Sequence, residues 1–508
     1  VHQLVGGAGN DVLLSRDGLS AGAEVRISGE LATSSAAPQV AAQSDGSFIV
    51  AWVGASAAHP GTAADLYVQA FDREGRALGG DRVLALDVDI ASVDMAPIDG
   101  GRYVVTWVAG SGIKVIVTDA SGQPQFAPYA VATSSVYATT PAVTAVGTGF
   151  FLAWSDKGSG DEWDVRGQFF GGDGSPQAAL TINGGLPSDQ YFPDVAALSN
   201  GRVAVSWSNL VTAGIPNLDV YSTVVSPDGT TTGDQIVNTR TELSQARPQM
   251  GALAGGGYVV TWLDNGGDGN GYGIKAQIYS AANARVGGEI LVNTSTVGYQ
   301  IYPAVNALAD GGFVVVWQDY GGSAADTEEF GIAAQRYGAD GNVVGDEMRL
   351  NSGTLGSQET PRVSPLGSLP GSFVAVWQDG DEIVVRTFDG TVDSVIDGGA
   401  GNDLAVLDRS SARSDLIVDL TPVAGVSTNI AGLQNIEQID LEAGSGNDIV
   451  YGGLFADRLV GNAGNDLFVG AGGDDSADGG SGADSLHGGD GADTLLGGTG
   501  DDRLLGGA

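Results

Sequence analysis

The chain has 508 residues, of which 42% are apolar and 82 are glycine, and it contains no cysteine. This length and apolar content allow more than one folded domain, while the lack of cysteine excludes a disulfide scaffold and thiolate metal sites. The formal net charge of −39 argues against nucleic acid or an anionic membrane surface as a partner. No apolar run reaches the roughly 18 residues that a membrane-spanning helix needs.

A glycine-rich nonapeptide follows directly after the first residues. Val1 to Val5 carries no secretory signal, and residues 6–14 then read GGAGNDVLL, with Asp11 in sixth place. The nearest match is GGAGNDLAV at residues 398–406, with Asp403 in sixth place. Everything between the two units has a different pattern. We therefore expect residues 1–20 to form one rung of a repeat structure that continues at the other end of the chain.

Seven apolar runs, each ending on a tryptophan, divide the middle of the chain. The tryptophans recur at intervals of 47 to 60 residues. They are Trp52, Trp107, Trp154, Trp207, Trp262, Trp317 and Trp377. Repeats of this length with several short strands each are typical of a β-propeller. A sugar-stacking ring is the alternative for these tryptophans, but at the end of a buried strand we expect them to form the core.

Residues 303–351 show the clearest repeat unit. PAVNAL reads as an inner strand, GFVVVW as a second strand buried on both faces, GIAAQRY as a third and VVGDEMRLN as an outer strand. Four strands in each of seven units predict a seven-bladed β-propeller over residues 21–395. The seventh unit lacks an outer strand, and AGAEVRISGEL at residues 21–31 is expected to supply it. This pairing would close the ring and remove open sheet edges.

The C-terminal part keeps a nine-residue frame. After an interruption at residues 407–442, which we interpret as a widened part of the same structure, seven units follow in frame from Ala443, among them GGSGADSLH and GGDGADTLL. Glycines at positions one, two and four allow positive φ angles and turn carbonyl groups inward, and the aspartate at position six adds a carboxylate. Such an all-oxygen cage suits a hard cation, and its flexible spacing favours Ca²⁺ over Mg²⁺. The last three positions alternate like a short strand, which predicts a parallel β-roll over residues 396–508 that folds on binding Ca²⁺.

The pattern G-G-x-G-x-D-x-U-x resembles the nonapeptide of RTX (repeats-in-toxin) proteins. The resemblance implies that turns two units apart share one Ca²⁺, which pairs Asp448 with Asp466, Asp457 with Asp475, Asp466 with Asp484, Asp475 with Asp493 and Asp484 with Asp502. The residues it assigns to several Ca²⁺ ions are Asp11, Asp403, Asp448, Asp457, Asp466, Asp475, Asp484, Asp493 and Asp502, with Gly479, Ser481, Gly488, Asp490, Gly498 and Gly500 in the best-formed turns. The pattern is interrupted where Phe455 replaces the third glycine, Asn462 and Ala471 replace the second, and Ala477 fills the inward apolar position. A disordered glycine-rich linker, the other interpretation, would not keep a strict nine-residue frame.

The sequence offers no constellation for catalysis. His2, His59 and His487 are scattered, and neither an HExxH helix nor a GxSxG turn is present. We therefore predict no catalytic residues and no enzymatic activity. Trp163 lies outside the repeat register, where it would contact a glycan or cover its blade. We interpret the acidic loops at residues 156–164, 264–273 and 319–329 as further Ca²⁺ sites, as a ligand surface or as solvated turns.

These expectations describe an all-β protein with two parts and a function outside the cell. RTX proteins are typically exported by type I secretion, which predicts a secreted or surface protein of a Gram-negative bacterium. The first hypothesis is a Ca²⁺-dependent structural or adhesive protein, such as an adhesin, a surface layer or a fibre component. The chain stops at the start of a further nonapeptide, so we expect the open roll ends to stack head to tail between copies. The alternative is a propeller that binds carbohydrate, including a cell-surface glycan, with the roll as a secretion and folding device.

Overall fold

The computed structural model is built from β-strands throughout the part of the chain that it describes. This part comprises residues 3–5, 12–16, 20–21, 23–27, 32–56, 64–86, 90–110, 112–131, 138–157, 162–211, 217–320, 330–352, 356–367, 369–389, 395–397, 401–409, 417–420, 432–434, 436–444 and 446–507. Two compact units divide the chain: residues 21–389 form one, and residues 1–20 together with 390–508 form the other. Over the described ranges, no helix is long and apolar enough to cross a membrane.

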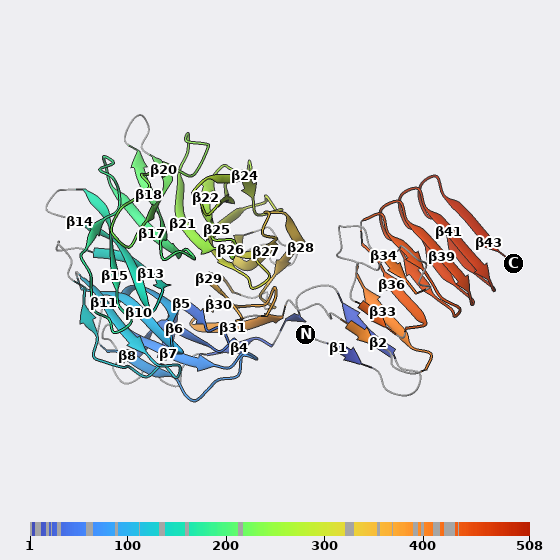
Figure 1. Cartoon of the computed structure of the whole chain (residues 1–508), viewed down its shortest axis with the longest axis horizontal. Helices are drawn as coiled ribbons and strands as arrows, with labels where there is room; N and C mark the ends of the chain where they lie inside the picture. The colour runs from blue at the N-terminus through green and yellow to red at the C-terminus, as the bar shows by residue number, and fades with distance from the viewer. Residues whose placement is uncertain are drawn as a thin grey trace. The chain divides into compact units, whose positions relative to one another are not determined.

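Residues 21–389 form a seven-bladed propeller, as predicted (Figure 1). Six blades are four-stranded antiparallel sheets whose strands follow chain order. The first blade consists of β5 (Ala32–Ala42), β6 (Phe48–Ser56), β7 (Asp65–Phe71) and β8 (Arg82–Ala85), and the second of β9 (Ile90–Ile98), β10 (Arg102–Ala109), β11 (Gly112–Thr118) and β12 (Tyr129–Ala130). The third consists of β13 (Ala138–Val146), β14 (Gly149–Lys157), β15 (Trp163–Phe170) and β16 (Leu180–Thr181), and the fourth of β17 (Gln190–Ala197), β18 (Val203–Val211), β19 (Asn217–Val225) and β20 (Gln235–Ile236). The fifth consists of β21 (Gln245–Ala252), β22 (Tyr258–Asn265), β23 (Tyr272–Tyr279) and β24 (Arg285–Leu291), and the sixth of β25 (Tyr299–Ala307), β26 (Phe313–Tyr320), β27 (Phe330–Tyr337) and β28 (Val343–Arg349).

The seventh blade closes the ring with a strand from the start of the propeller. Its own strands are β29 (Gln358–Pro365), β30 (Phe373–Asp379) and β31 (Glu382–Asp389). The short strands β3 (Ser20–Ala21) and β4 (Val25–Arg26) both pair with β31, and Val25 lies opposite Val385 in antiparallel register. Arg26 also forms ion pairs of 2.6 Å with Asp379 and with Glu382. Pairing of the first strand with the last blade leaves no open edge at the point of closure.

Each blade core is centred on its tryptophan. The seven tryptophans of the second strands are at most 2% exposed, so the prediction that they are core residues is confirmed. Their neighbours along the strand are equally buried, as in the run Phe313 to Trp317, because each blade is covered by another on both faces. Aromatic pairs join the second and third strands, for example Phe313 with Tyr337 at 4.9 Å between ring centroids. This packing fixes the first strands around the axis, where the blades meet.

The second unit is a parallel β-roll made of stacked rungs. One sheet has the order β2 (Val12–Arg16), β33 (Leu404–Asp408), β36 (Gln438–Glu442), β38 (Arg458–Val460), β40 (Ser476–Asp478), β42 (Thr494–Leu496). The sheet opposite has the order β34 (Ile417–Asp419), β37 (Ile449–Tyr451), β39 (Leu467–Gly472), β41 (Ser485–Asp490), β43 (Arg503–Gly507). A three-stranded sheet joins β1 (Gln3–Val5), β32 (Val395–Asp397) and β35 (Gly432–Gln434). The inward side chains, such as Leu459, Phe468 and Leu486, are buried in a narrow core between the sheets.

The N-terminal rung of the chain pairs with the rung that follows the propeller in sequence. Strand β2 pairs in parallel with β33, and Val12 lies opposite Leu404, the seventh residue of each matching nonapeptide. The interrupted stretch also belongs to the roll, because β36 lies between β33 and β38. The compact propeller unit ends at residue 389, and Val395 pairs with Gln3 in the roll unit. A complete propeller is therefore inserted between two adjacent rungs of one solenoid.

Candidate functional site

A ladder of aspartates runs along the turns of the roll. The Oδ1 atom of Asp466 accepts a hydrogen bond of 2.8 Å from the backbone nitrogen of Asp448, 18 residues earlier. The same contact recurs at 2.8 to 3.0 Å for each later pair, namely Asp457 with Asp475, Asp466 with Asp484, Asp475 with Asp493 and Asp484 with Asp502. These are the five pairs implied by the repeat pattern. Two nine-residue units make one full turn of the roll, which brings every second unit into register.

From Asp457 onward, the second carboxylate oxygen of each aspartate faces a glycine at position one of its own unit. A Cβ atom added to Gly470 would lie 1.9 Å from Oδ2 of Asp475 and 2.6 Å from the carbonyl oxygen of Gly488. At Gly461 the corresponding distances are 2.3 Å to Asp466 and 2.6 Å to Gly479. A side chain at position one would therefore occupy the space beside two oxygen atoms. The glycine leaves this oxygen-lined space open.

Glycines at positions two and four take backbone angles that other residues rarely adopt. Gly482 and Gly500 have φ values of 139° and 138°, and a Cβ atom on either would lie 1.7 Å from a carbonyl oxygen of the preceding turn. Asn462 and Ala471 replace glycine at position two and still have φ values of 64° and 77°. The turn geometry is thus maintained even where the sequence departs from the pattern, at a cost in backbone strain.

The aspartates of the ladder are buried and lie close to one another. Asp448, Asp457, Asp466, Asp475 and Asp484 are at most 2% exposed. Burial raises the pKa of Asp457 and of Asp475 to about 6, and for Asp475 the neighbouring carboxylates raise it further. Burial also raises the pKa of Asp484. A cation between the turns would offset both the desolvation and the mutual repulsion of these carboxylates.

Three of these carboxylates also have an oxygen without a hydrogen bond. Oδ2 of Asp475, of Asp484 and of Asp493 is buried and receives no hydrogen bond. In the described part of the chain, no three His, Cys, Asp or Glu side chains group around one point. A bound ion would thus be held by one or two carboxylates and by backbone carbonyls. Oxygen donors of this kind fit Ca²⁺, which accepts six to eight ligands in flexible geometry.

The remaining predicted site residues differ from this arrangement. Asp457 uses its Oδ2 atom to accept a hydrogen bond of 2.7 Å from Gly453, in the turn where Phe455 interrupts the pattern. Ser481 and Asp490 have exposed side chains, and their carbonyl groups accept hydrogen bonds from Gly464 and Gly473. Gly498 has a φ of 92°, in the same region as Gly480. Asp11 lies outside the described residues.

The irregular rung contains an acid that the repeat pattern does not reveal. Asp403 is buried, and its backbone nitrogen donates a hydrogen bond of 3.0 Å to Oε2 of Glu437. Gln438 pairs with Leu404, so the residues directly before them, Glu437 and Asp403, lie at equivalent positions of adjacent rungs. Glu437 therefore takes the place of the next aspartate in the ladder. A glutamate directly before the alternating run QIDLE is the signal in the sequence that could have indicated this position.

The predicted accessory sites of the propeller are less regular. Trp163 begins strand β15 and is half-buried, 6.3 Å from Tyr191 between ring centroids. In the loop at residues 264–273, Asp264 is buried and bonded to Gln245, and Asp268 accepts a hydrogen bond from Asn270. Residues 158–161 and 321–329 of the other two acidic loops lie outside the described residues.

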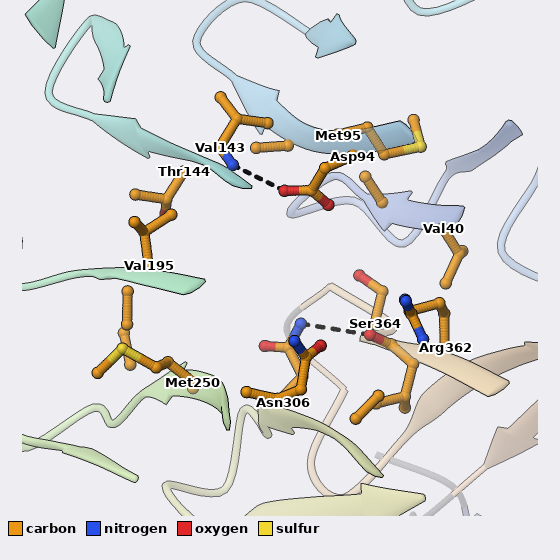
Figure 2. A pocket seen from close by; sticks show the side chains of 18 of the residues that line it. Val40, Asp94, Met95, Val143, Thr144, Val195, Met250, Asn306, Arg362 and Ser364 are labelled. Carbon is orange, nitrogen blue, oxygen red and sulfur yellow. Dashed lines mark hydrogen bonds between the residues drawn. The ribbon is translucent and has the colours of Figure 1, made fainter. Parts of the chain in front are cut away.

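A pocket of about 290 Å³ lies on the propeller axis (Figure 2). The first strands of all seven blades line it. Five of its polar side chains occupy equivalent positions, each opposite the residue that precedes a buried tryptophan: Gln39, Asp94, Asp194, Gln249 and Arg362. The backbone nitrogen of Val143 donates to Asp94 and that of Met250 donates to Asp194, so each acid joins its own blade to the next. Burial raises the pKa of Asp94 to about 6 and that of Asp194 to about 8.

Comparison with protein families identifies the repeats. The model of the RTX calcium-binding nonapeptide repeat matches four copies, over residues 3–18, 442–477 and 478–508. The chain therefore carries RTX calcium-binding repeats, and it combines them with a seven-bladed propeller. A search of curated proteins found none with significant similarity.

Several solved structures are similar to this chain at low identity. A protein of unknown function from Dyadobacter fermentans matches with a TM-score of 0.45 and 12% identity, over 73% of this chain and 99% of its own. A sialidase from Streptococcus pneumoniae matches with a TM-score of 0.43 and 10% identity, over 73% and 70% of the two chains. An α-L-arabinanase from Penicillium chrysogenum matches with a TM-score of 0.40 and 11% identity, over 73% and 98%.

These matches correct the expectation that the chain is not an enzyme. The similar structures include a sialidase and an α-L-arabinanase, at 10% and 11% identity. The prediction relied on motifs such as HExxH and GxSxG, in which the catalytic residues are close in sequence. In a propeller, residues from seven separate blades meet at the axis, so short motifs do not test this fold for activity.

Proposed function

We propose that the protein is an extracellular, Ca²⁺-dependent binding protein, in which the RTX roll folds on binding several Ca²⁺ ions and the propeller contacts the ligand. The observation that carries this proposal is the aspartate ladder, with its buried carboxylates paired at a spacing of 18 residues. Asp448, Asp466, Asp484 and Asp502 would hold ions along one edge of the roll, and Asp457, Asp475 and Asp493 along the other. The ions would supply the positive charge that these turns lack.

Folding of the roll would depend on the calcium concentration outside the cell. Extracellular modules bind Ca²⁺ at about 10⁻⁴ to 10⁻³ M, well above cytosolic concentrations. The whole chain has a net charge of −39, and in the roll Asp475, Asp484 and Asp493 each have a buried carboxylate oxygen that receives no hydrogen bond. The roll would therefore stay unfolded during export and fold outside. RTX repeats are typical of secreted proteins, and a Gram-negative source and surface location remain predictions.

A Ca²⁺ titration of the chelated full-length protein tests this function. All eight tryptophans lie within residues 21–389, so tryptophan fluorescence reports on the propeller alone. Circular dichroism reports on the strands of both units. We expect the strand signal to grow with Ca²⁺ while the fluorescence stays constant. No response of the strand signal would refute the proposal.

A carbohydrate-binding propeller is the second candidate, and the axial pocket favours it. Amide, carboxylate and guanidinium groups converge there from five blades, as in a site that orients a polar ligand. Adhesion through a glycan would combine the two hypotheses. Head-to-tail self-association of the rolls remains a separate prediction, and light scattering in millimolar Ca²⁺ tests it.

A further inference from the structure

The first strands of the propeller share a backbone distortion at one end. Six of them contain a residue with a φ between 49° and 54°, located at a shift of register with the second strand: Ala37, Thr140, Phe192, Arg247, Tyr302 and Thr360. Each of these residues is followed by a proline. Bulges of this kind change the direction of one side chain and are frequent beside binding sites.

In three consecutive blades the redirected side chains are large and contact one another. The guanidinium of Arg247 lies 4.4 Å from the ring centroid of Phe192 and 5.1 Å from that of Tyr302. Phe192 belongs to the blade before Arg247 and Tyr302 to the blade after it. Both rings therefore hold the planar cation between them by cation–π attraction.

The aromatic contacts continue towards the preceding blade. The ring centroid of Tyr191 lies 6.1 Å from Phe192 and 6.3 Å from Trp163. Trp163, Tyr191, Phe192, Arg247 and Tyr302 thus form a row across four neighbouring blades, which we call the aromatic row. Tyr302 is 36% exposed and Arg247 is also exposed, so the row is accessible to a ligand.

The charge of Arg247 is available for binding. Arg362 lies inside the axial pocket (Figure 2), where it acts electrostatically on Asp94 and Asp194. Arg247, by contrast, forms no ion pair with any carboxylate of the described residues; it lies against the two rings, its backbone nitrogen donates to Ser208, and its charge acts repulsively on Arg362. In a protein with a net charge of −39, a fixed guanidinium without a counter-ion indicates a binding partner that supplies one.

We infer that the aromatic row binds an acidic glycan, with Arg247 donating hydrogen bonds to a carboxylate or sulfate of the sugar and the rings stacking on the sugar faces. Aromatic side chains offer flat apolar surfaces next to polar groups, and the planar guanidinium matches an anionic group with two oxygens. The row lies at strand ends rather than along an open strand edge, which disfavours an extended peptide. A single guanidinium matches one anionic group of a sugar, whereas nucleic acid presents a continuous row of phosphates. This inference deepens the second candidate function and rests on it.

Binding of defined oligosaccharides to the full-length protein in Ca²⁺ tests the inference. The probes are hexagalacturonate, its methyl ester, which lacks the charge, and a sulfated dextran hexamer, measured by calorimetry at physiological ionic strength. We expect hexagalacturonate to bind at least about tenfold more tightly than the ester. Tighter binding of the sulfated probe, lost in the same variants, would support the site and assign it to sulfate. Equal binding of the charged and methylated probes would overturn the inference.

Variants of the row separate ligand binding from stability. Arg247→Ala and Arg247→Lys should both weaken binding at least about tenfold, because lysine keeps the charge but lacks the planar fork. Tyr302→Ala should weaken it as well. Arg73→Ala, an exposed arginine in a turn of the first blade, is the matched control and should bind normally. Unchanged affinity in Arg247→Lys, a variant that keeps the length and charge of the side chain, would overturn the inference.

A failure of the glycan-binding inference can be told apart from a failure of the proposed Ca²⁺-dependent folding. The same samples are titrated with Ca²⁺ and followed by circular dichroism. A roll that responds to Ca²⁺ in a protein that binds no probe would refute the glycan site and leave the Ca²⁺-dependent folding intact.

Discussion

The side-chain amide of Asn238 donates a hydrogen bond of 3.2 Å to Oε1 of Gln245, which joins the outer end of one blade to the inner strand of the next. Oδ1 of Asn238 accepts from the backbone nitrogen of Val220, and Gln245 donates to Asp264. The same pair, always seven residues apart, recurs at three other blade junctions: Asn183 with Gln190, Asn293 with Gln300 and Asn351 with Gln358. These buried amides connect consecutive blades along the chain.

The first prediction concerns this amide pair. Gln245→Ala should lower the free energy of unfolding of the propeller by about 2 kcal/mol, because Asp264 loses a donor in a buried position. The measurement is urea unfolding followed by tryptophan fluorescence in chelator. Gln125→Ala removes an exposed glutamine and should stay within about 0.5 kcal/mol. Equal effects of the two substitutions would show that the pair contributes nothing specific.

The second prediction concerns the aspartate ladder. Asp484→Asn keeps an oxygen that can accept from the backbone nitrogen of Asp466 at 2.8 Å, but it removes the charge. The Ca²⁺ midpoint for folding of the roll should rise about tenfold, which corresponds to about 1.4 kcal/mol. Circular dichroism during a Ca²⁺ titration measures it. Asp501→Asn changes an exposed acid of the same turn region and should leave the midpoint in place; a similar rise in that control would mean that only overall charge matters.

The third prediction concerns backbone strain in the roll. Ala471 has a φ of 77°, where a Cβ atom costs roughly 1 kcal/mol. Ala471→Gly should therefore stabilise the Ca²⁺-loaded roll by up to about 1 kcal/mol, less the chain entropy that glycine adds to the unfolded state. The reverse change, Gly480→Ala, should destabilise it, since the new Cβ would lie 2.2 Å from the carbonyl oxygen of Asn462. Thermal unfolding in saturating Ca²⁺ compares the two, and destabilisation by Ala471→Gly or stabilisation by Gly480→Ala would contradict the strain argument.

The fourth prediction concerns the pH dependence of the propeller. Burial raises the pKa of Asp194 to about 8, against about 3.9 in an unfolded chain. Asp94 raises it further, whereas the positive charge of Arg362 lowers it. The folded protein therefore binds more protons between these two values, and its free energy of unfolding should fall as the pH rises from about 4 to about 8.

Urea unfolding at several pH values, followed by tryptophan fluorescence, measures this slope. One proton corresponds to at most about 1.4 kcal/mol per pH unit. Asp194→Asn should flatten the slope, because it removes the carboxyl group that binds the proton. The side-chain oxygen of asparagine can still accept from the backbone nitrogen of Met250, so the hydrogen bond is kept. Asp173→Asn is the control, because this exposed acid has a lowered pKa through its bonds to Ser175. A slope that persists unchanged in Asp194→Asn would assign the pH dependence to other groups.

Much of the fold follows from periodicity in the sequence. The tryptophan spacing predicted seven blades, since each strand that is covered on both faces reads as a continuous apolar run. The nine-residue frame predicted a parallel roll, and the pairing of Asp466 with Asp484 agrees with one turn of 18 residues. The N-terminal nonapeptide pairs with its match 392 residues later, at Val12 and Leu404. Repeats carry this information because each unit repeats the same local contacts.

Other features depend on contacts that the sequence pattern alone did not reveal. The Asn–Gln pairs have a regular spacing, but only the arrangement of neighbouring blades shows that they hydrogen-bond one blade to the next. The aromatic row is a stronger case, because Phe192, Arg247 and Tyr302 are about 55 residues apart and appear unrelated in the chain. Glu437 was missed because the rung around it does not keep the nine-residue frame.

The architecture, the Ca²⁺-binding repeats and the core tryptophans could all be predicted from the chain, because these features rest on short-range periodicity and on burial. The folded structure was needed to show which polar side chains converge on the propeller axis, such as Asp194 and Arg362, and which side chains the bulges bring together around Arg247. Closing the ring places equivalent positions of all seven blades around one axis. A binding site assembled in this way uses one or two residues from each blade, so no single stretch of the sequence contains it.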